Sequence, residues 1–306
     1  MSRVRLRLPA TSANLGPGFD TLGLALKIYL EIEAEEAPGF AIEVTGRDAA
    51  LCGATRDNLL IDAYCALLTV AGRPVVPLRL RMRNEIPLGM GCGSSAAVRL
   101  AAAALAGHFG ALGWDRERIL AEACRLEGHP DNAAACWLGG FVASAMSGNA
   151  EARAIRAISI APPQAWRALL VMPEQPLATA ESRAVLPERY TRQEVVDNLQ
   201  RVALLTGAFA AGRADLLGLG MEDRLHQPYR AAMCPLLGKL LPLAQQAGIA
   251  GVALSGAGPA VLLLAASAAD ADAASRAART AAAGMGEVEI LTCALEAEPA
   301  WFRTAV

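Results

Sequence analysis

The sequence predicts an α+β protein of two domains. Its 306 residues are about twice the roughly 150 of a typical domain, and 54% of them are hydrophobic, enough to fill a sizeable core. Stretches with strand-type alternation and stretches with helical patterns follow one another in both halves, which suggests an α+β sandwich in each. A polar segment at 147–150 separates the halves, so we expect one domain over 1–150 and a second over 151–306.

The composition excludes several classes of protein. A net charge of −2 provides no basic field for nucleic acid or for an anionic membrane surface. No apolar run approaches the roughly 18 residues that cross a bilayer, and residues 1–8 lack the apolar core of a signal peptide. The seven cysteines include no C-x-x-C pair, so they predict neither a disulfide framework nor a zinc site. We therefore expect a cytoplasmic protein without nucleic-acid or membrane partners.

Strand-type stretches are expected in both halves. In residues 3–8 and 78–82 apolar residues alternate with arginines, which is typical of a strand with one buried and one wet face. The acidic turn at 33–39 predicts a hairpin between its two neighbouring strands. The expected strands are 3–8, 24–32, 40–45, 78–82, 141–145, 155–160, 166–172, 251–254, 261–265 and 288–295.

Helix-type stretches lie between these strands. Asn58 and Asp115 are suited to cap two of them, because their side chains can accept hydrogen bonds from the free N–H groups of a first turn. Thr179 is a similar N-cap candidate for a short helix or turn over 179–183. The expected longer helices are 58–71, 96–106, 115–126, 192–211, a leucine-rich stretch ending at 221, 234–247 and 270–283.

A polar stretch at 9–23 follows the first strand. It is rich in Asn, Gly and Pro and carries few side chains to bury, which is typical of a loop. Loops this long are uncommon in compact domains unless they have a function. Its polar side chains Asn14 and Asp20 are therefore candidate site residues. The alternative is that both form only local Asx turns.

The glycine-rich stretch at 87–97 is a candidate phosphate-binding loop. Glycine allows positive φ and close approach of a ligand, so successive N–H groups can converge on an anion. Ser94 and Ser95 are candidate N-caps of the next helix, whose N-terminus would favour a bound phosphate. The stretch matches neither the Walker A nor the dinucleotide pattern, and a turn that only caps a helix remains the alternative. The residues are Pro87, Leu88, Gly89, Met90, Gly91, Cys92, Gly93, Ser94, Ser95, Ala96 and Ala97.

A second polar segment, 127–132, follows the expected helix 115–126. Glu127 and Asp131 have a glycine and a proline between them, so they do not share a helical face. Mg²⁺ prefers oxygen ligands, so Glu127 and the Ser95 hydroxyl form a candidate magnesium site, with Glu122 as a rival ligand. The alternative is that Glu127 is only an exposed charge at a helix end.

Three segments in this order, 9–20, 87–97 and 255–259, resemble the motifs of the GHMP small-molecule kinases. Within that superfamily the chain most resembles the homoserine kinase family, on the strength of 9–20 and 127–132. The resemblance spans essentially the whole chain. It implies a ribosomal-S5-type N-terminal domain and a ferredoxin-like C-terminal domain, with ATP between them and its triphosphate on 87–97. It also implies phosphorylation of the side-chain hydroxyl of L-homoserine, the step before threonine synthase, usually by a homodimer.

The chain offers the charges that such a substrate requires. Homoserine is a zwitterion, so its site needs an anion, a cation and a means of orienting the hydroxyl. Asp20 suits the ammonium group, and Arg183 and Arg230 can hold the carboxylate in bidentate geometry. The resemblance places Asn14 beside the reacting groups. The alternative for both arginines is a solvated surface position.

Phosphoryl transfer depends on alignment and charge neutralisation. We expect Ser95 and Glu127 to hold Mg²⁺. The resemblance places Asn132 where it can orient the hydroxyl, and Thr179 near the hydroxyl or the γ-phosphate. Some relatives use an aspartate base with a nearby lysine; Asp131 is a possible counterpart, but no lysine lies close to it in the sequence. The sequence therefore favours a mechanism without a strong general base.

Two other functions remain open. A mevalonate or isoprenoid substrate lacks an ammonium group, so Asp20 favours an amino-acid alcohol. A catalytically inactive nucleotide-binding regulator on the same scaffold would not need Ser95, Glu127 and Asn132 together. Cys92 departs from the family pattern, which usually has an aliphatic residue there. Beside a helix N-terminus we expect its pKa to be lowered and its thiol to be reactive, so that alkylation slows ATP binding.

Overall fold

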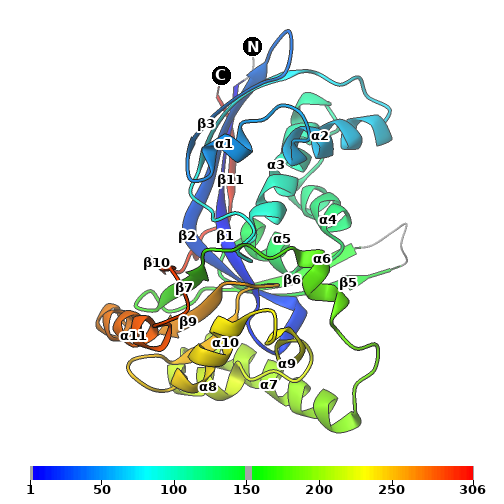
Figure 1. Cartoon of the computed structure of the whole chain (residues 1–306). Helices are drawn as coiled ribbons and strands as arrows, with labels where there is room; N and C mark the ends of the chain where they lie inside the picture. Colours follow the sequence, from blue (N-terminus) through cyan, green and yellow to red (C-terminus); the bar gives the residue numbers. More distant parts are fainter. Residues whose placement is uncertain (1–2, 149–153, 306) are drawn as a thin grey trace.

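Two β-sheets and the helices packed on them make up the structure (Figure 1). The computed structural model describes residues 3–148 and 154–305. Helices and mainly antiparallel strands mix in both halves, so the predicted α+β architecture is confirmed. Within the described residues, no helix is both long and apolar enough to cross a membrane.

The first sheet has seven strands and supports the upper part of the molecule in Figure 1. Five strands lie in the order β11-β1-β2-β4-β3, and β5 pairs with both β2 and β6. The strands are β1 Arg3–Asn14, β2 Gly18–Glu36, β3 Ala41–Gly46, β4 Leu78–Asn84, β5 Phe141–Ser147, β6 Ala154–Ile160 and β11 Trp301–Ala305.

One face of this sheet is apolar and the other is charged, because side chains alternate along each strand. In β4 every second residue is buried and the arginines between them are exposed. On the charged face, Arg5 of β1 and Arg81 of β4 both pair with Glu33 of β2, at N–O distances of 2.8 and 3.3 Å. The apolar face is the one that the helices cover.

Helices α2 to α5 pack over the apolar face. The predicted caps are confirmed, since the Asn58 side chain accepts from the N–H groups of α2 and the Asp115 side chain from α4. Buried alanines line much of α3, which lets that helix approach its neighbours closely. The helices are α1 Ala49–Cys52, α2 Leu59–Val70, α3 Ser94–Phe109, α4 Arg116–Glu127 and α5 Asp131–Leu138.

The second sheet has four antiparallel strands in the order β10-β7-β9-β8. Together with α7 and α11 its strands follow the β-α-β-β-α-β arrangement of ferredoxin-like domains. The elements are β7 Arg167–Pro173, α6 Thr179–Ala184, α7 Arg192–Ala211, α8 Leu217–Gly220, α9 Gln227–Arg230, α10 Pro235–Leu240, β8 Gly251–Leu254, β9 Val261–Ala265, α11 Ala268–Ala281 and β10 Val288–Ala294.

Both faces of this second sheet are covered. One face packs on α10 and α11, and the other continues into the core of the first sheet. There Phe141 of β5 stacks on Phe209 of α7, with ring centroids 4.1 Å apart. Every residue of β9 is therefore buried, which explains why that strand is an unbroken apolar run and does not alternate.

Two predictions near the N-terminus are wrong. The stretch 9–23 is not a long loop: β1 continues to Asn14, and β2 starts at Gly18 after a three-residue turn. Nor do 24–32 and 40–45 form a hairpin. Antiparallel β4 lies between β2 and β3, and β3 pairs in parallel with β4. The glutamates of β2 face arginines of β4, which favours this order.

The predicted helix 234–247 is too long. Helix α10 ends at Leu240 and is followed by a 3₁₀ turn, Leu241–Leu243, that contains Pro242. Proline has no N–H to donate to the preceding turn, so it ends the α-helix there.

The division at residue 150 stays a prediction. Residues 149 and 150 of the expected boundary lie outside the described part of the chain. Strands β6 and β11 follow the boundary in sequence but extend the first sheet, β11 by pairing with β1. The final strand, β11, was not predicted.

Candidate active site

The glycine-rich stretch connects β4 to the N-terminus of α3. Gly89, Gly91 and Gly93 have φ of 67, 75 and 73°, the left-handed region that favours glycine. Gly93 is itself the N-cap, so the predicted capping by Ser94 or Ser95 is wrong; both lie in the first turn, where their N–H groups face the loop.

Close packing also requires glycine here. A Cβ added at Gly93 would lie 1.9 Å from Oγ1 of Thr11, and one at Gly91 would lie 2.1 Å from the carbonyl oxygen of Ser255. Thr11 also donates its main-chain N–H to the carbonyl oxygen of Cys92, at 3.0 Å. The Ser255 hydroxyl donates to the carbonyl oxygen of Gly91, at 2.8 Å. The three sequence motifs therefore meet at this loop.

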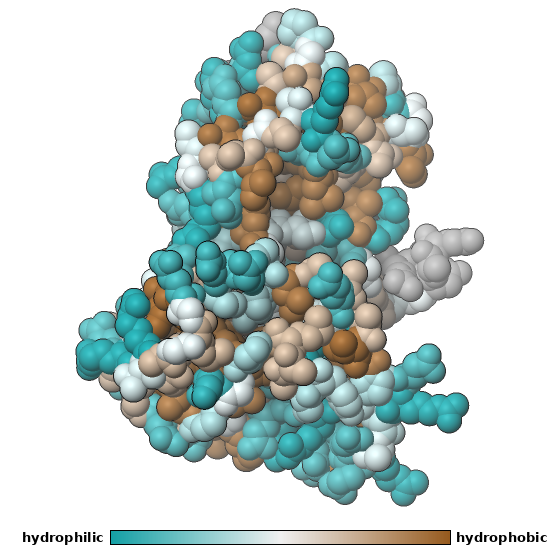
Figure 2. Space-filling view, viewed as in Figure 1, coloured by the Kyte–Doolittle hydropathy of each residue, from teal (hydrophilic) through white to brown (hydrophobic). Residues whose placement is uncertain are grey.

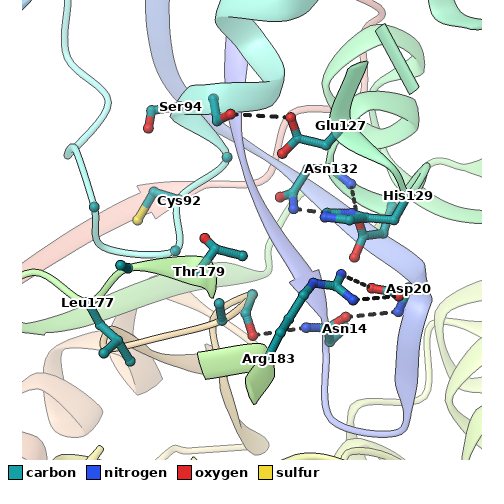
Figure 3. Close-up of a pocket in the computed structure, with 18 of the residues that line it drawn as sticks. Asn14, Asp20, Cys92, Ser94, Glu127, His129, Asn132, Leu177, Thr179 and Arg183 are labelled. Atoms are coloured by element: carbon teal, nitrogen blue, oxygen red, sulfur yellow. Dashed lines mark hydrogen bonds and ion pairs between the residues drawn. The ribbon is translucent and has the colours of Figure 1, made fainter. Parts of the chain in front are cut away.

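A polar cavity of about 240 Å³ opens between these motifs, α4, α5 and α6 (Figure 3). Besides five further residues of the glycine-rich stretch, eight residues of the predicted site line it: Asn14, Asp20, Ser95, Glu127, Asn132, Thr179, Arg183 and Arg230. From the glycine-rich stretch, Gly89, Gly91, Cys92, Gly93 and Ser94 also line it, whereas Pro87, Leu88, Met90, Ala96 and Ala97 do not.

Asp20 and Arg183 form a bidentate ion pair in this cavity. Nη2 of Arg183 lies 2.6 Å from Oδ1 of Asp20, and Nη1 lies 3.1 Å from Oδ2. Asn14 holds the Asp20 backbone, because its Oδ1 accepts the Asp20 N–H at 3.0 Å while its Nδ2 donates to the carbonyl of Gly256. The two alternatives for Asn14 and Asp20 therefore do not exclude each other: the side chain of Asn14 bonds the local backbone, and both residues line the cavity. Figure 3 shows Arg183 reaching from α6 across to Asp20.

Arg230 is buried, so the solvated-surface alternative is wrong for it. The residue is 1% exposed, and its Nε donates to the carbonyl oxygen of Ser182 at 3.0 Å. Its Nη1 donates to Nδ1 of His226 at 3.0 Å, and Nε2 of His226 therefore carries the proton that it donates to Gly16, at 2.7 Å. Burial lowers the pKa of His226, which keeps the ring neutral. His226 gave no signal in the sequence.

Asn132 and Asp131 begin α5 beside the glycine-rich stretch. Oδ1 of Asn132 accepts the Thr11 hydroxyl at 2.7 Å. Oδ1 of Asp131 lies 2.6 Å from Nδ1 of His129 and accepts the Asn132 N–H at 2.7 Å. Burial alone would lower the pKa of His129, but the hydrogen bond and charge of Asp131, with the charge of Asp20, raise it. Thr11 and His129 were not among the predicted site residues.

Glu127 ends α4 and faces the start of α3. Its Oε2 accepts the Ser95 hydroxyl at 3.2 Å, and Nη1 of Arg99 contacts both Oε2 and the Ser95 hydroxyl. A carboxylate with a hydroxyl is a hard-oxygen donor set that fits Mg²⁺. Glu122 pairs instead with Arg118 and Arg125 and does not line the cavity. Arg99 does not belong to any of the motifs recognised in the sequence.

Thr179 is the first residue of α6 and lines the cavity, as Figure 3 shows. The N-cap of α6 is Ala178, so the prediction that Thr179 caps this helix is wrong. Its hydroxyl is therefore not needed by the helix, and the side chain lies between the glycine-rich stretch and Arg183.

Cys92 does not have the predicted lowered pKa. Its side chain is 1% exposed, and burial raises the pKa of the thiol to about 12. The prediction fails because the cost of desolvating a thiolate outweighs the effect of a nearby helix N-terminus. Cys92 occupies the place of an aliphatic core residue.

An apolar cavity of about 260 Å³ adjoins the polar one. The two share Ser94 and Ser95 at the N-terminus of α3. In Figure 2 a brown hollow opens in the upper part of the molecule, where Figure 1 places α2 and α3. No motif in the sequence indicated this cavity, whose apolar wall is formed by Leu51, Cys52, Leu59, Leu60, Met82, Leu88 and Val98.

Comparisons with known proteins agree with this arrangement. Residues 58–140 match the GHMP kinases N terminal domain family, and residues 205–284 match the GHMP kinases C terminal family. The chain is 45% identical to a homoserine kinase of Solibacter usitatus over 84% of each chain. It is 38% identical to one of Thermus thermophilus over 87% of this chain and 88% of the relative.

Solved structures share the whole fold. The homoserine kinase of Cytophaga hutchinsonii superposes with a TM-score of 0.81 at 22% identity, covering 98% of this chain and 97% of the other. The L. major mevalonate kinase superposes with a TM-score of 0.73 at 17% identity, covering 96% of each chain. The two-domain GHMP fold is thereby confirmed, and the chain belongs to the GHMP kinase superfamily and, within it, to the homoserine kinase family.

Proposed function

We propose that this protein transfers the γ-phosphoryl group of ATP to the side-chain hydroxyl of L-homoserine, giving O-phospho-L-homoserine for threonine biosynthesis. One observation carries the proposal: the Asp20–Arg183 ion pair lies in the same cavity as the glycine-rich stretch. A charged pair beside an anion-binding loop suits a zwitterionic acceptor and a triphosphate donor. The 45% identity to a homoserine kinase supports the same substrate.

The Asp20–Arg183 pair presents one negative and one positive group to the substrate. The ammonium group of homoserine binds Asp20, and its carboxylate binds Arg183 and Arg230, both of which line the cavity. Arg230 is held by Ser182 and His226, so its orientation is set before substrate arrives. Mevalonate has no ammonium group to place on Asp20, which disfavours that alternative.

ATP lies across the two adjoining cavities. Its flat base fits the apolar cavity, and its phosphates lie on the backbone N–H groups of the glycine-rich stretch at the positive end of α3. Ser95 and Glu127 would hold Mg²⁺, which when bound supplies positive charge to the phosphate oxygens. The path between base and phosphates passes Ser94 and Ser95, which both cavities share.

The acceptor hydroxyl is oriented without a strong base. Thr11 occupies Oδ1 of Asn132, and Nδ2 donates to Oδ1 of Asp131 at a long 3.5 Å, so the second hydrogen of Nδ2 remains to meet the hydroxyl oxygen. Oδ1 of Asp131 already bonds His129 and the Asn132 N–H, and among the described residues that line the cavity there is no lysine. Thr179 lies where its hydroxyl can contact the acceptor or the γ-phosphate. Without a free base, the hydroxyl proton passes to an oxygen of the transferred phosphoryl group.

An ADP-release assay with homoserine, mevalonate and galactose tests the proposal. Turnover with homoserine alone is the expected result. Preference for mevalonate would favour the isoprenoid alternative, and ATP binding without turnover on any amino alcohol would favour the inactive regulator. The resemblance also leads us to expect a cytoplasmic homodimer, which light scattering of the purified protein and fractionation of cells can check.

A matched pair of variants tests the acceptor site. Arg183→Lys removes bidentate geometry from the cavity and should raise KM for homoserine by about tenfold or more, with KM for ATP unchanged. Arg213→Lys makes the same change in an exposed pair, where Arg213 contacts Asp215 through Nε at 2.8 Å and Nη2 at 2.6 Å, and should leave both KM values unchanged. Equal effects of the two substitutions would contradict the assignment.

A further inference from the structure

Arg99 lies at the two oxygens that the proposed function assigns to the metal. The residue is in the second turn of α3, four positions after Ser95, and side chains on a helix tilt towards its N-terminus. Its Nη1 contacts both the Ser95 hydroxyl oxygen and Oε2 of Glu127, the same two atoms that hydrogen-bond to each other at 3.2 Å. A guanidinium group in contact with both oxygens takes up lone pairs there and repels a divalent cation that approaches the same two atoms.

Arg99 reaches these atoms from beside the cavity and not through it. Ser95 and Glu127 line the polar cavity, but Arg99 does not. The side chains of Arg99 and Glu127 are 24% and 10% exposed, so the ion pair is largely shielded from water. Partial shielding strengthens both the attraction between Arg99 and Glu127 and the repulsion between Arg99 and a second cation. Arg99 also retains a route to solvent.

We propose that Arg99 is an internal cation that occupies the magnesium-binding oxygens and must leave them before a metal can bind. This inference rests on the proposed function, because it takes Ser95 and Glu127 as the metal ligands. In the metal-free protein, Arg99 neutralises Glu127, so the carboxylate does not repel nucleotide phosphates. When the metal–nucleotide complex binds, release of Arg99 reduces the apparent affinity for the metal. The nucleotide affinity of this protein should therefore depend less on metal than that of a protein whose Glu127 carboxylate has no cation beside it.

Removing the charge of Arg99 tests the inference by binding measurements. We would titrate Mn²⁺ into the full-length protein at saturating ADP and follow free Mn²⁺ by electron paramagnetic resonance. In parallel, calorimetry would measure ADP binding in EDTA. Arg99→Met keeps the apolar stem and should lower the Kd for Mn²⁺ by about tenfold, because a competing cation is gone. The same change should weaken ADP binding in EDTA, because Glu127 is left bare.

Two further variants keep the test decisive. Arg125→Met removes an arginine from α4 whose Nε donates to Glu122 at 2.8 Å, and it should change neither measurement. Arg99→Lys keeps the charge. The ratio of its ADP affinity with metal to its ADP affinity without metal should therefore stay within about threefold of the wild-type ratio. This second variant also serves if Arg99→Met does not fold.

The outcomes separate the two proposals. If Arg99→Met leaves the Mn²⁺ affinity unchanged or weakens it, Arg99 does not compete with the metal and the inference is overturned. A ratio of ADP affinities with and without metal that rises well beyond threefold of wild type in Arg99→Lys would overturn it too. If the wild-type protein does not phosphorylate homoserine, the proposed function fails instead, whatever the binding data show.

Discussion

Replacing Gly93 by alanine tests how the glycine-rich stretch controls the site. The φ of Gly93 is 73°, and an added Cβ would lie 1.9 Å from Oγ1 of Thr11 and 3.1 Å from Oδ1 of Asn132. These two atoms hydrogen-bond to each other at 2.7 Å. The methyl group therefore pushes directly on the contact that orients Asn132. Gly72 is a matched control, because its φ is 66° and nothing lies within 4 Å of an added Cβ.

The two substitutions should differ by the cost of the clash. Alanine at positive φ costs about 1 kcal/mol in either position, which is the whole effect expected for Gly72→Ala. Gly93→Ala should also break the bond between Thr11 and Asn132, which adds about 1 kcal/mol more, and the backbone must shift as well. We expect a total loss of about 2 kcal/mol or more in the free energy of unfolding. Displacement of Asn132 should lower kcat/KM by about 100-fold.

Urea unfolding followed by circular dichroism measures the stability difference, and the ADP-release assay measures kcat/KM. Gly72→Ala should keep wild-type kcat/KM. Thr11→Ala combined with Gly93→Ala removes the closest atom and should recover part of the lost stability. The reasoning is refuted if Gly93→Ala and Gly72→Ala lose equal stability, or if Gly93→Ala retains wild-type kcat/KM.

Three further predictions follow from burial and charge. Cys92 should resist iodoacetamide in the folded protein while the partly exposed Cys52 reacts, as mass spectrometry of the alkylated peptides would show; early modification of Cys92 would contradict its raised pKa. The pKa of His129 is raised, so its stabilising contribution is full below the ordinary histidine pKa of about 6.5 and is lost as pH rises through the folded-state pKa. His129→Gln should flatten that part of the unfolding free-energy profile, and an unchanged profile would argue against the interaction with Asp131. Val98→Asp puts a carboxylate in the apolar cavity and should raise KM for ATP about tenfold, with KM for homoserine unchanged. A raised KM for homoserine with an unchanged KM for ATP would show that the adenine base does not bind in that cavity.

Much of the fold could be predicted because it depends on local patterns. Alternation in β4 and the caps at Asn58 and Asp115 involve residues within a few positions of one another. Strand partners could not be predicted in the same way. The parallel pairing of β3 with β4 joins segments separated by helix α2, and nothing in the local sequence of β3 distinguishes it from a hairpin partner of β2.

The features of the candidate site also separate into those that could be predicted from the sequence and those that could not. The sequence by itself determined which chemical groups are available: the glycine-rich stretch, the carboxylates of Asp20 and Glu127, and the amide of Asn132. Only the tertiary structure decided which groups bond each other. It put Arg99 on Glu127 and buried the thiol of Cys92. The physical reason is that charge, pKa and hydrogen bonding depend on neighbours in space, and chain folding brings those neighbours from distant parts of the sequence.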